Sequence, residues 1–260
     1  MMVENLLAGK KILVTGVTSK ESIAYAFAEF AQQQGAQVIV SNLGRALSLT
    51  QRVVTRLDPV PPVIELDVTD DEHLARLPQQ LRGAGFDQLD GVLHSIAFAN
   101  PSRALGGAFL DTEWRDVAIS LQTSAYSLKS LTMAVRELLV AGSSIVGLTF
   151  DASVSWPSYD WMGIAKAALE STNRYLARYL GGDQIRVNLV AAGPINSIAK
   201  TAIPGAEAFD EEWAKRAPLG WDENDATPVA KAIAALMSEL FPATTGEIVH
   251  VDGGMASTGA

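Results

Sequence analysis

The sequence predicts an α/β protein with a doubly wound, parallel, seven-stranded sheet and helices on both of its faces. Short apolar runs alternate with amphipathic segments of helical period from one end of the 260-residue chain to the other. Most of these runs are apolar throughout, as strands are when helices cover both faces of a sheet. A β-α-β-α order requires right-handed crossovers and places ligands at the carboxyl ends of the strands.

Each expected strand is an apolar run of four to six residues that ends at a turn or at the start of a helix. In chain order the strands are Lys11–Thr15, Gln37–Val40, Val63–Asp67, Gly91–Ser95, Ser144–Thr149, Arg186–Val190 and Glu247–Val251. Helices are expected where apolar residues recur every three or four positions. They are Ser22–Gln34, Arg45–Leu57, Asp71–Arg82, Asp111–Val140, Tyr159–Leu180 and Thr227–Leu240.

The connection 191–225 is unusually long and rich in Gly, Pro, Ala and charged residues, with one short helix expected near Phe209–Arg216. Long connections inside compact domains are usually lids or binding loops. We therefore expect residues 1–260 to form one domain, with 196–225 as a substrate lid.

Composition excludes several classes of function. The chain has no cysteine, which rules out a disulfide scaffold and thiolate chemistry and suits a reducing compartment, so we expect the cytoplasm. No signal peptide is expected, because the start MMVENLLAGKK lacks the basic-then-apolar order, and no membrane span is expected, because no run of ~18 apolar residues occurs. A net charge of −9 argues against nucleic acid as a partner. His73, His94 and His250 lack ligand spacing, so we expect no metal.

The first strand ends at Gly16 and the next helix begins near Ser22, which is the place where doubly wound, Rossmann-type folds bind pyrophosphate. Gly16 permits close backbone approach, and Ser22 offers a hydroxyl beside the positive end of the helix dipole. The later glycines of G-x-G-x-x-G are missing. A turn glycine and a helix cap explain this segment equally well.

Other strand ends lie on the same edge of the expected sheet. Asp67 can accept a hydrogen bond from an adenine amino group and Val68 offers its backbone, although a plain helix cap at Asp67 is the alternative. The small residues Ala97 and Gly193 let a nucleotide lie against the backbone, and Pro194 sets a turn. These ends predict a dinucleotide site.

Tyr159 and Lys166 are seven positions apart, which is about two helical turns, so one ligand can contact both side chains. An ammonium near a phenol favours the ionised form and makes the hydroxyl a better donor to developing negative charge. This pair therefore predicts oxyanion stabilisation. An arbitrary Tyr/Lys pair is more often an interfacial tyrosine and a solvated lysine.

With its neighbours, the pair resembles the enoyl-acyl-carrier-protein reductases of the short-chain dehydrogenase/reductase superfamily, over essentially the whole chain. Lysine follows tyrosine by seven residues in that branch, whereas other members place it at the position of Gly163. The segments that carry the resemblance are Gly16 with Ser22-Ile23-Ala24, Leu66-Asp67-Val68, His94-Ser95-Ile96, Tyr159–Met162 with Lys166–Glu170, Asn188–Ile195, Thr244–Gly246 and Asp252–Gly254. The surrounding sequence looks closest to the mycolic-acid branch.

The resemblance implies reduction of a trans-2-enoyl thioester on acyl carrier protein by NADH. Tyr159 would bind the thioester carbonyl, Lys166 would hold the nicotinamide ribose, and Phe150 would pack beside the reacting carbons or serve only as core. The cofactor-binding residues would be Gly16, Ser22, Ile23, Asp67, Val68, Ser95, Ile96, Ala97, Lys166, Gly193, Pro194, Ile195 and Ser197. The substrate-binding residues would be Tyr159, Met162, Ala202, Ile203, Phe209 and Trp213.

Several departures from the family pattern bear on specificity. Arg45, with no carboxylate near it after the second strand, leaves NADPH open as the cofactor. Ala97 stands for the usual glycine, and Thr149 for an acidic residue. A lid over 198–213 that is shorter than in the mycolic-acid branch predicts shorter acyl chains. The family also implies a homotetramer joined through 111–140 and 159–180. The alternatives are another carbonyl or imine reductase, or a non-catalytic NAD(P)-binding regulator.

Overall fold

A computed structural model describes residues 5–259 and contains the expected seven-stranded parallel sheet. The strand order is β3-β2-β1-β4-β5-β6-β7. The strands are β1 Lys11–Thr15, β2 Gln37–Asn42, β3 Val63–Glu65, β4 Leu89–His94, β5 Leu139–Thr149, β6 Arg186–Ala192 and β7 Ile248–Val251. Because the order reverses between β1 and β4, these two neighbouring strands form the switch point at which doubly wound sheets bind ligands.

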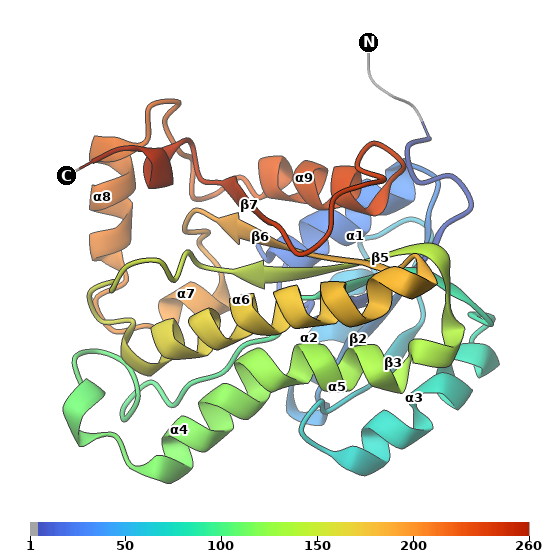
Figure 1. The fold of residues 1–260 in the computed structure, drawn as a ribbon, viewed down its shortest axis with the longest axis horizontal. Coiled ribbons are helices and arrows are strands. Elements are labelled where there is room, and N and C mark those ends of the chain that lie inside the picture. Colours follow the sequence, from blue (N-terminus) through green and yellow to red (C-terminus); the bar gives the residue numbers. More distant parts are fainter. Residues whose placement is uncertain (1–4, 260) are drawn as a thin grey trace.

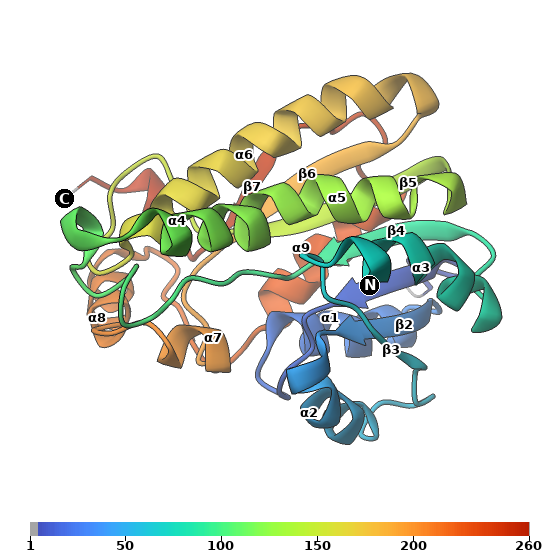
Figure 2. The same ribbon diagram turned by 90° about the horizontal axis from the view of Figure 1, so that it is seen from below.

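Helices cover both faces of the sheet, which makes three layers (Figure 2). One face carries α1 Ile23–Gln33, α2 Gly44–Val54 and α9 Thr227–Met237; the other carries α3 Asp71–Gly83, α4 Trp114–Leu121, α5 Ser127–Ala134 and α6 Asp160–Leu180. Ile12 and Val14 pack into the first core and Leu13 packs into the second, because successive side chains of a strand point to opposite faces. The two cores explain why β1 is apolar throughout.

Two short helices of the long connection, α7 Ile198–Thr201 and α8 Glu207–Arg216, lie at the end toward which the strand arrows point (Figure 1). The sequence predicted one helix here, and the structure adds α7, which the Ser197 side chain caps. A four-residue helix is too short to show helical periodicity in a sequence. The connection therefore covers the carboxyl ends of the strands, where a lid would have to lie.

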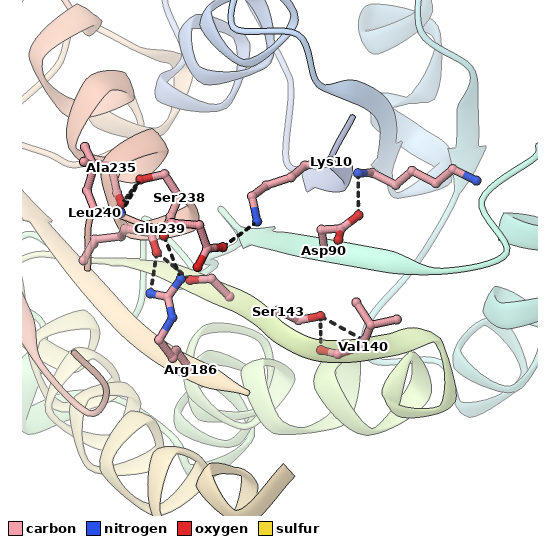
Figure 3. Close-up of polar contacts among 12 residues, drawn as sticks. Lys10, Asp90, Val140, Ser143, Arg186, Ala235, Ser238, Glu239 and Leu240 are labelled. Atoms are coloured by element: carbon pink, nitrogen blue, oxygen red, sulfur yellow. Dashed lines mark hydrogen bonds and ion pairs between the residues drawn. The ribbon is translucent and has the colours of Figure 1, made fainter. Parts of the chain in front are cut away.

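The opposite, amino end of the sheet is tied together by buried polar contacts (Figure 3). The guanidinium of Arg186 donates to the carbonyl oxygens of Leu236, at 2.6 Å, and Ser238, at 3.0 Å. The backbone N–H of Lys11 donates to Asp90 over 2.9 Å. The C-terminal carbonyls of a helix have no partner within the helix, so Arg186 satisfies this end of α9.

The expectation of one helix over Asp111–Val140 is confirmed only over Trp114–Ala134, where α4, a π-helical turn and α5 follow one another without a break. The structure divides this segment into a 3₁₀ turn, α4, a π-helical turn at Gln122–Tyr126, α5 and a second 3₁₀ turn, and β5 already begins at Leu139. Helical apolar spacing runs on through Leu131, Val135 and Leu138, so the change to a strand leaves no mark in the pattern. In residues 5–259 no helix has the length and apolar character to cross a membrane.

Candidate active site

Backbone segments meet closely at the switch point between β1 and β4. Gly16 has a φ of +79°, and a Cβ atom built on it would lie 1.9 Å from the carbonyl oxygen of Ser95. The Thr15 hydroxyl donates to Leu93 O over 2.9 Å and accepts from the Ser95 N–H over 3.0 Å. Glycine is therefore needed at position 16 for two reasons, and Thr15, which the motif reading missed, fixes the spacing of the two strand ends.

The loop from β1 leads directly to the start of α1, where Ser22 is the N-cap. Its hydroxyl accepts from the Tyr25 N–H over 3.2 Å and donates to Ser19 O over 2.8 Å. Ile23, the first helical residue, is partly buried against the core. α1 thus begins directly after the loop that leaves β1, and the free N–H groups of a helix start can bind an anion.

Asp67 does not cap a helix, because the N-cap of α3 is Asp70. Its Oδ1 atom instead accepts from the N–H of Thr69, at 2.9 Å, and from the Thr69 hydroxyl, at 2.6 Å. The Asp67 N–H donates to His73 Nδ1 over 3.1 Å. His73 therefore holds the loop that presents Asp67 and Val68, a role that its isolated place in the sequence did not reveal.

The end of β6 is pressed between two indole rings. A Cβ atom on Gly193 would lie 2.6 Å from Trp221 Cε2 and 2.7 Å from Trp213 Nε1, so only glycine fits. The Trp221 indole N–H donates to Pro194 O over 2.7 Å and fixes the turn. The structure places the remaining cofactor candidates at strand ends too: Val68 and Ile195 are buried, Ile96 and Ser197 are partly buried, and Ala97 is exposed.

Tyr159 lies at the start of α6 between two residues with positive φ, Ser158 at +62° and Asp160 at +38°. Such backbone is costly for residues other than glycine and is concentrated at functional sites. The Asp160 carboxylate accepts from the N–H groups of Gly107, at 2.7 Å, and Ala108, at 3.1 Å, which holds the strained turn in place. The turn in turn fixes the tyrosine ring.

The electrostatics of Tyr159 differ from the sequence expectation. Burial raises the pKa of Tyr159 well above its ordinary value of 10, whereas we expected Lys166 to favour the ionised form. Burial is the whole cause of this shift, and the Lys166 ammonium, which donates to Leu148 O at the end of β5 over 2.9 Å, does not offset it. In the protein without ligands, Tyr159 is therefore a neutral hydrogen-bond donor at physiological pH.

Lys166 is buried near the end of β5, on the same face of α6 as Met162 and Leu169. Burial lowers its pKa from 10.5 to about 8, and Glu170, one turn along the helix, opposes that shift. The Glu170 carboxylate also accepts from the Thr149 hydroxyl over 3.0 Å. Glu170 was not predicted, and it supplies a carboxylate beside the position where the family's acidic residue is replaced by Thr149.

Aromatic side chains pack around Phe150, directly after β5. Its ring centroid lies 5.1 Å from those of Tyr159 and Trp156, 5.3 Å from Phe209 and 5.5 Å from Trp213. We call these five residues the aromatic cluster. The cluster contains one residue directly after β5, two residues just before α6 and two residues of α8, so it connects α8 to the tyrosine.

Most of the predicted substrate residues meet in this region. Met162, Phe209 and Trp213 are buried in the same apolar core as Tyr159, and Ile203 packs against it. Ala202, by contrast, is exposed and does not join this core, so its place in the substrate wall stays a prediction. Ile203 is partly buried although it is the next residue, and this difference between neighbours cannot be read from composition.

A wide hollow of about 1160 Å³ lies beside the edge strand β7, with Glu170 and Trp221 among its lining residues. Six carboxylates line it: Asp151, Glu170, Asp222, Asp225, Glu247 and Asp252. So many negative charges would repel the phosphates of a dinucleotide, which favours the switch point as the nucleotide site. Within the described part of the chain, no group of three His, Asp or Glu side chains is placed to hold a metal ion.

Comparison with known proteins gives a consistent picture. A family model described as enoyl-(acyl carrier protein) reductase matches residues 16–256. The chain is 44% identical to a protein of Mycolicibacterium smegmatis and 45% identical to one of Mycobacterium avium, both named enoyl-acyl-carrier-protein reductase (NADH), over 97% of this chain and 98% of each relative. It is 34% identical to a Staphylococcus aureus enoyl-acyl-carrier-protein reductase (NADPH), over 95% of this chain and 97% of that relative.

Proposed function

Because the chain belongs to the enoyl-(acyl carrier protein) reductase family, we propose that it reduces trans-2-enoyl thioesters on acyl carrier protein, with NADH as reductant, in fatty-acid elongation. The observation that carries the proposal is the arrangement around α6. Tyr159 and Lys166 lie at the carboxyl edge of the sheet, and the aromatic cluster surrounds the tyrosine. Apolar surroundings with one neutral donor suit a substrate that develops charge only during reaction.

The residues around the switch point fit a dinucleotide. Gly16 and Ser95 bring two strand ends together, the start of α1 faces that edge, and Lys166 lies beside the end of β5. Backbone N–H groups at a helix start would hold the pyrophosphate, and the ammonium would donate to the nicotinamide ribose. When bound, NADH supplies the hydride that adds to C3 of the enoyl group.

The chain's own side chains would stabilise the charge that this addition creates. The Tyr159 hydroxyl would donate a hydrogen bond to the oxygen of the enolate. Its raised pKa keeps the phenol protonated, so that this donor is present when the charge develops. Lys166 would orient the ribose and place positive charge near the same oxygen. Phe150 holds the tyrosine ring and excludes water, and it has no group that could transfer a proton.

The preference for NADH over NADPH rests on the mycobacterial relatives, which are named as NADH enzymes. The residues near the end of β2, where the adenine ribose would bind, do not favour NADH over NADPH. The Arg45 guanidinium lies over the Phe98 ring, 5.5 Å from its centroid, near the end of β2. Leaving that ring would let Arg45 meet a 2′-phosphate, so equal or better efficiency with NADPH in steady-state assays would overturn the choice of NADH.

The setting of the enzyme is part of the same proposal. Residues 196–225, with α7 and α8, would act as the substrate lid of one 260-residue domain, working in the cytoplasm as a homotetramer. Large apolar side chains exposed along α4, the π-helical turn, α5 and α6 support an interface there: Trp114, Tyr126, Met133, Ile164, Tyr175 and Tyr179.

The test of the proposed reaction is direct. The purified protein is mixed with NADH and a trans-2-enoyl thioester, and absorbance at the nicotinamide band is followed. We expect loss of absorbance in proportion to the thioester added, and none with the saturated thioester. If NADH binds by calorimetry but no enoyl thioester of four to sixteen carbons is reduced, the proposal is wrong.

A further inference from the structure

Trp213 carries a polar atom that the apolar role of a substrate wall does not use. Its side chain, on α8, is 4% exposed, and its indole nitrogen is buried with no hydrogen-bond partner among the described residues. The other two indoles beside it are satisfied. Trp221 donates to Pro194 O over 2.7 Å, and Trp156 donates to Asp151 O over 2.6 Å. Leaving a donor buried and unpaired costs ~1–3 kcal/mol, so this exception needs a cause.

The place of the unpaired N–H points to a ligand. Trp213 Nε1 is the atom that a Cβ on Gly193 would approach to 2.7 Å, so it lies against the backbone at the carboxyl end of β6. Pro194 and Ile195 follow directly on that backbone. The small space that Trp213 helps to line is about 10 Å³, at the lower limit for one water molecule. A ligand at the end of β6 is a better partner than trapped water.

The surroundings select the chemistry of that partner. An indole N–H is a donor only, so the ligand must supply an acceptor. The walls are the rings of the aromatic cluster and Trp221, and burying a charged acceptor among them would be expensive. A neutral carbonyl oxygen fits. Under the proposed function, on which this inference rests, two are available: the carboxamide of the nicotinamide and the carbonyl of the enoyl thioester.

The geometry favours the carboxamide. The Phe150 ring contacts two side chains, Tyr159, which would bind the thioester carbonyl, and the indole of Trp213. The indole nitrogen adjoins Gly193, at the end of β6, where the nicotinamide is expected. We propose that the indole N–H of Trp213 donates a hydrogen bond to the carboxamide oxygen of the bound nicotinamide, so that the lid helix α8 contributes directly to cofactor binding.

The experiment compares NADH binding by calorimetry in the wild type, Trp213→Phe and the matched control Trp156→Phe. Both variants shorten one ring of the aromatic cluster, but only the first removes an unpaired donor. A neutral hydrogen bond is worth ~0.5–1.5 kcal/mol, so we expect Trp213→Phe to weaken NADH about three- to tenfold and Trp156→Phe less than twofold. Equal affinities in the wild type and Trp213→Phe would overturn the inference.

A second arm identifies the acceptor. Thionicotinamide NADH carries sulfur, a weak acceptor, in place of the carboxamide oxygen, so the penalty of Trp213→Phe should disappear with it. A penalty of the same size with both cofactors would mean lost packing and would refute the hydrogen bond. An unchanged NADH affinity with a raised KM for the enoyl thioester would assign the bond to the thioester instead and refute the carboxamide.

Folding and the proposed function are controlled separately. Melting curves without ligand should show Trp213→Phe to be at least as stable as Trp156→Phe, because the first loses an unpaired donor and the second loses a hydrogen bond. If Trp213→Phe does not fold, 3-benzothienylalanine at position 213 keeps the shape and removes the N–H. A wild type that neither binds nor consumes NADH would refute the proposed function, whereas an active wild type with an unaffected variant refutes only the role of Trp213.

Discussion

Tyr159 is held by packing as firmly as by its backbone, which makes its hydroxyl separable from its ring. In Tyr159→Phe the contact with Phe150, 5.1 Å between centroids, should survive while the donor is lost. Because the hydroxyl would stabilise charge that exists only during reaction, we expect kcat to fall ~10²–10³-fold. NADH affinity by calorimetry should stay within twofold. A variant with full turnover would remove Tyr159 from the mechanism.

The buried charge of Lys166 lowers the stability of the folded protein. With a pKa of about 8 in the folded protein and about 10.5 in the unfolded chain, it binds more protons unfolded than folded between those values. Stability therefore rises with pH across that window, and below pH 8 the burial of the charge destabilises the fold. Lys166→Met removes this cost, so its melting temperature should exceed that of the wild type at pH 7.

The pH dependence separates this effect from simple repacking. The advantage of Lys166→Met should shrink between pH 7 and pH 9.5, because the wild-type lysine becomes neutral in the folded state. NADH binding should weaken in the variant at both pH values, since the donor to the ribose is gone. Differential scanning calorimetry and titration calorimetry measure the two quantities. A constant difference in melting temperature across this range would contradict the assigned pKa.

At the scale of elements, the proposed lid would determine which substrates fit. Phe209 and Trp213 of α8 pack against Phe150, so we predict that the acyl chain lies along these residues under a short lid. Each buried methylene is worth ~0.8 kcal/mol, about fourfold in affinity. We expect kcat/KM to rise with chain length in a series from four to sixteen carbons, and to flatten once the chain emerges into water.

Variants of α8 test whether this helix sets the chain length at which kcat/KM stops rising. Phe209→Leu shortens a wall residue and should move the plateau to longer chains, whereas Ala208→Ser, on the exposed side of the same helix, should leave it in place. Efficiency that climbs steeply through sixteen carbons in the wild type would mean that the chain is gripped elsewhere.

Some helices and strands could be predicted from the apolar pattern of the sequence, and others could not. β1 was predicted with its bounds intact, since an apolar run between Lys11 and Thr15 has sharp ends. The π-helical turn at Gln122–Tyr126 was missed, although it places Ser124 to bond both backbone groups of Phe98, at 2.9 and 3.0 Å, and Ser127 to bond His94 at 2.7 Å. One inserted residue in a helical turn leaves apolar spacing almost unchanged, so it becomes visible only in the contacts.

The same limit applies to the site. A seven-residue spacing placed Tyr159 and Lys166 on related faces of α6, but it could not show that the ammonium donates to Leu148 O. Nor could it show that Gly193 is compressed by two indoles from a segment 20 to 28 residues away. Tertiary packing, rather than residue type, causes the burial that raises the pKa of Tyr159 and leaves the Trp213 N–H without a partner.

At the scale of the whole molecule, the groups proposed to bind ligands lie at one end of the sheet and stabilising polar contacts lie at the other end. The carboxyl end gathers strained backbone, buried ionisable groups and an unpaired donor, and each of these lowers stability. The amino end is closed by satisfied contacts such as Arg186 with Leu236 and Ser238 (Figure 3). This division lets the ligand-binding edge hold costly groups without unfolding the chain.

We predict that the outer face of α6 joins the copies of the proposed homotetramer. Ile164, Tyr175 and Tyr179 lie along one stripe, since eleven residues are about three helical turns, and Tyr179 is 75% exposed. Large exposed apolar stripes mark interfaces, and symmetric homo-oligomers repeat one such surface on each copy.

With a chain mass of 27.6 kDa, light scattering should give a particle of about 110 kDa. Tyr175→Glu combined with Tyr179→Glu should reduce that mass, because burying two carboxylates in the interface is costly. Leu49→Glu, on α2 at the opposite face, should not. A wild type that elutes as a single 27.6-kDa particle, or a doubly charged variant that keeps the full mass, would show that these helices do not join the copies.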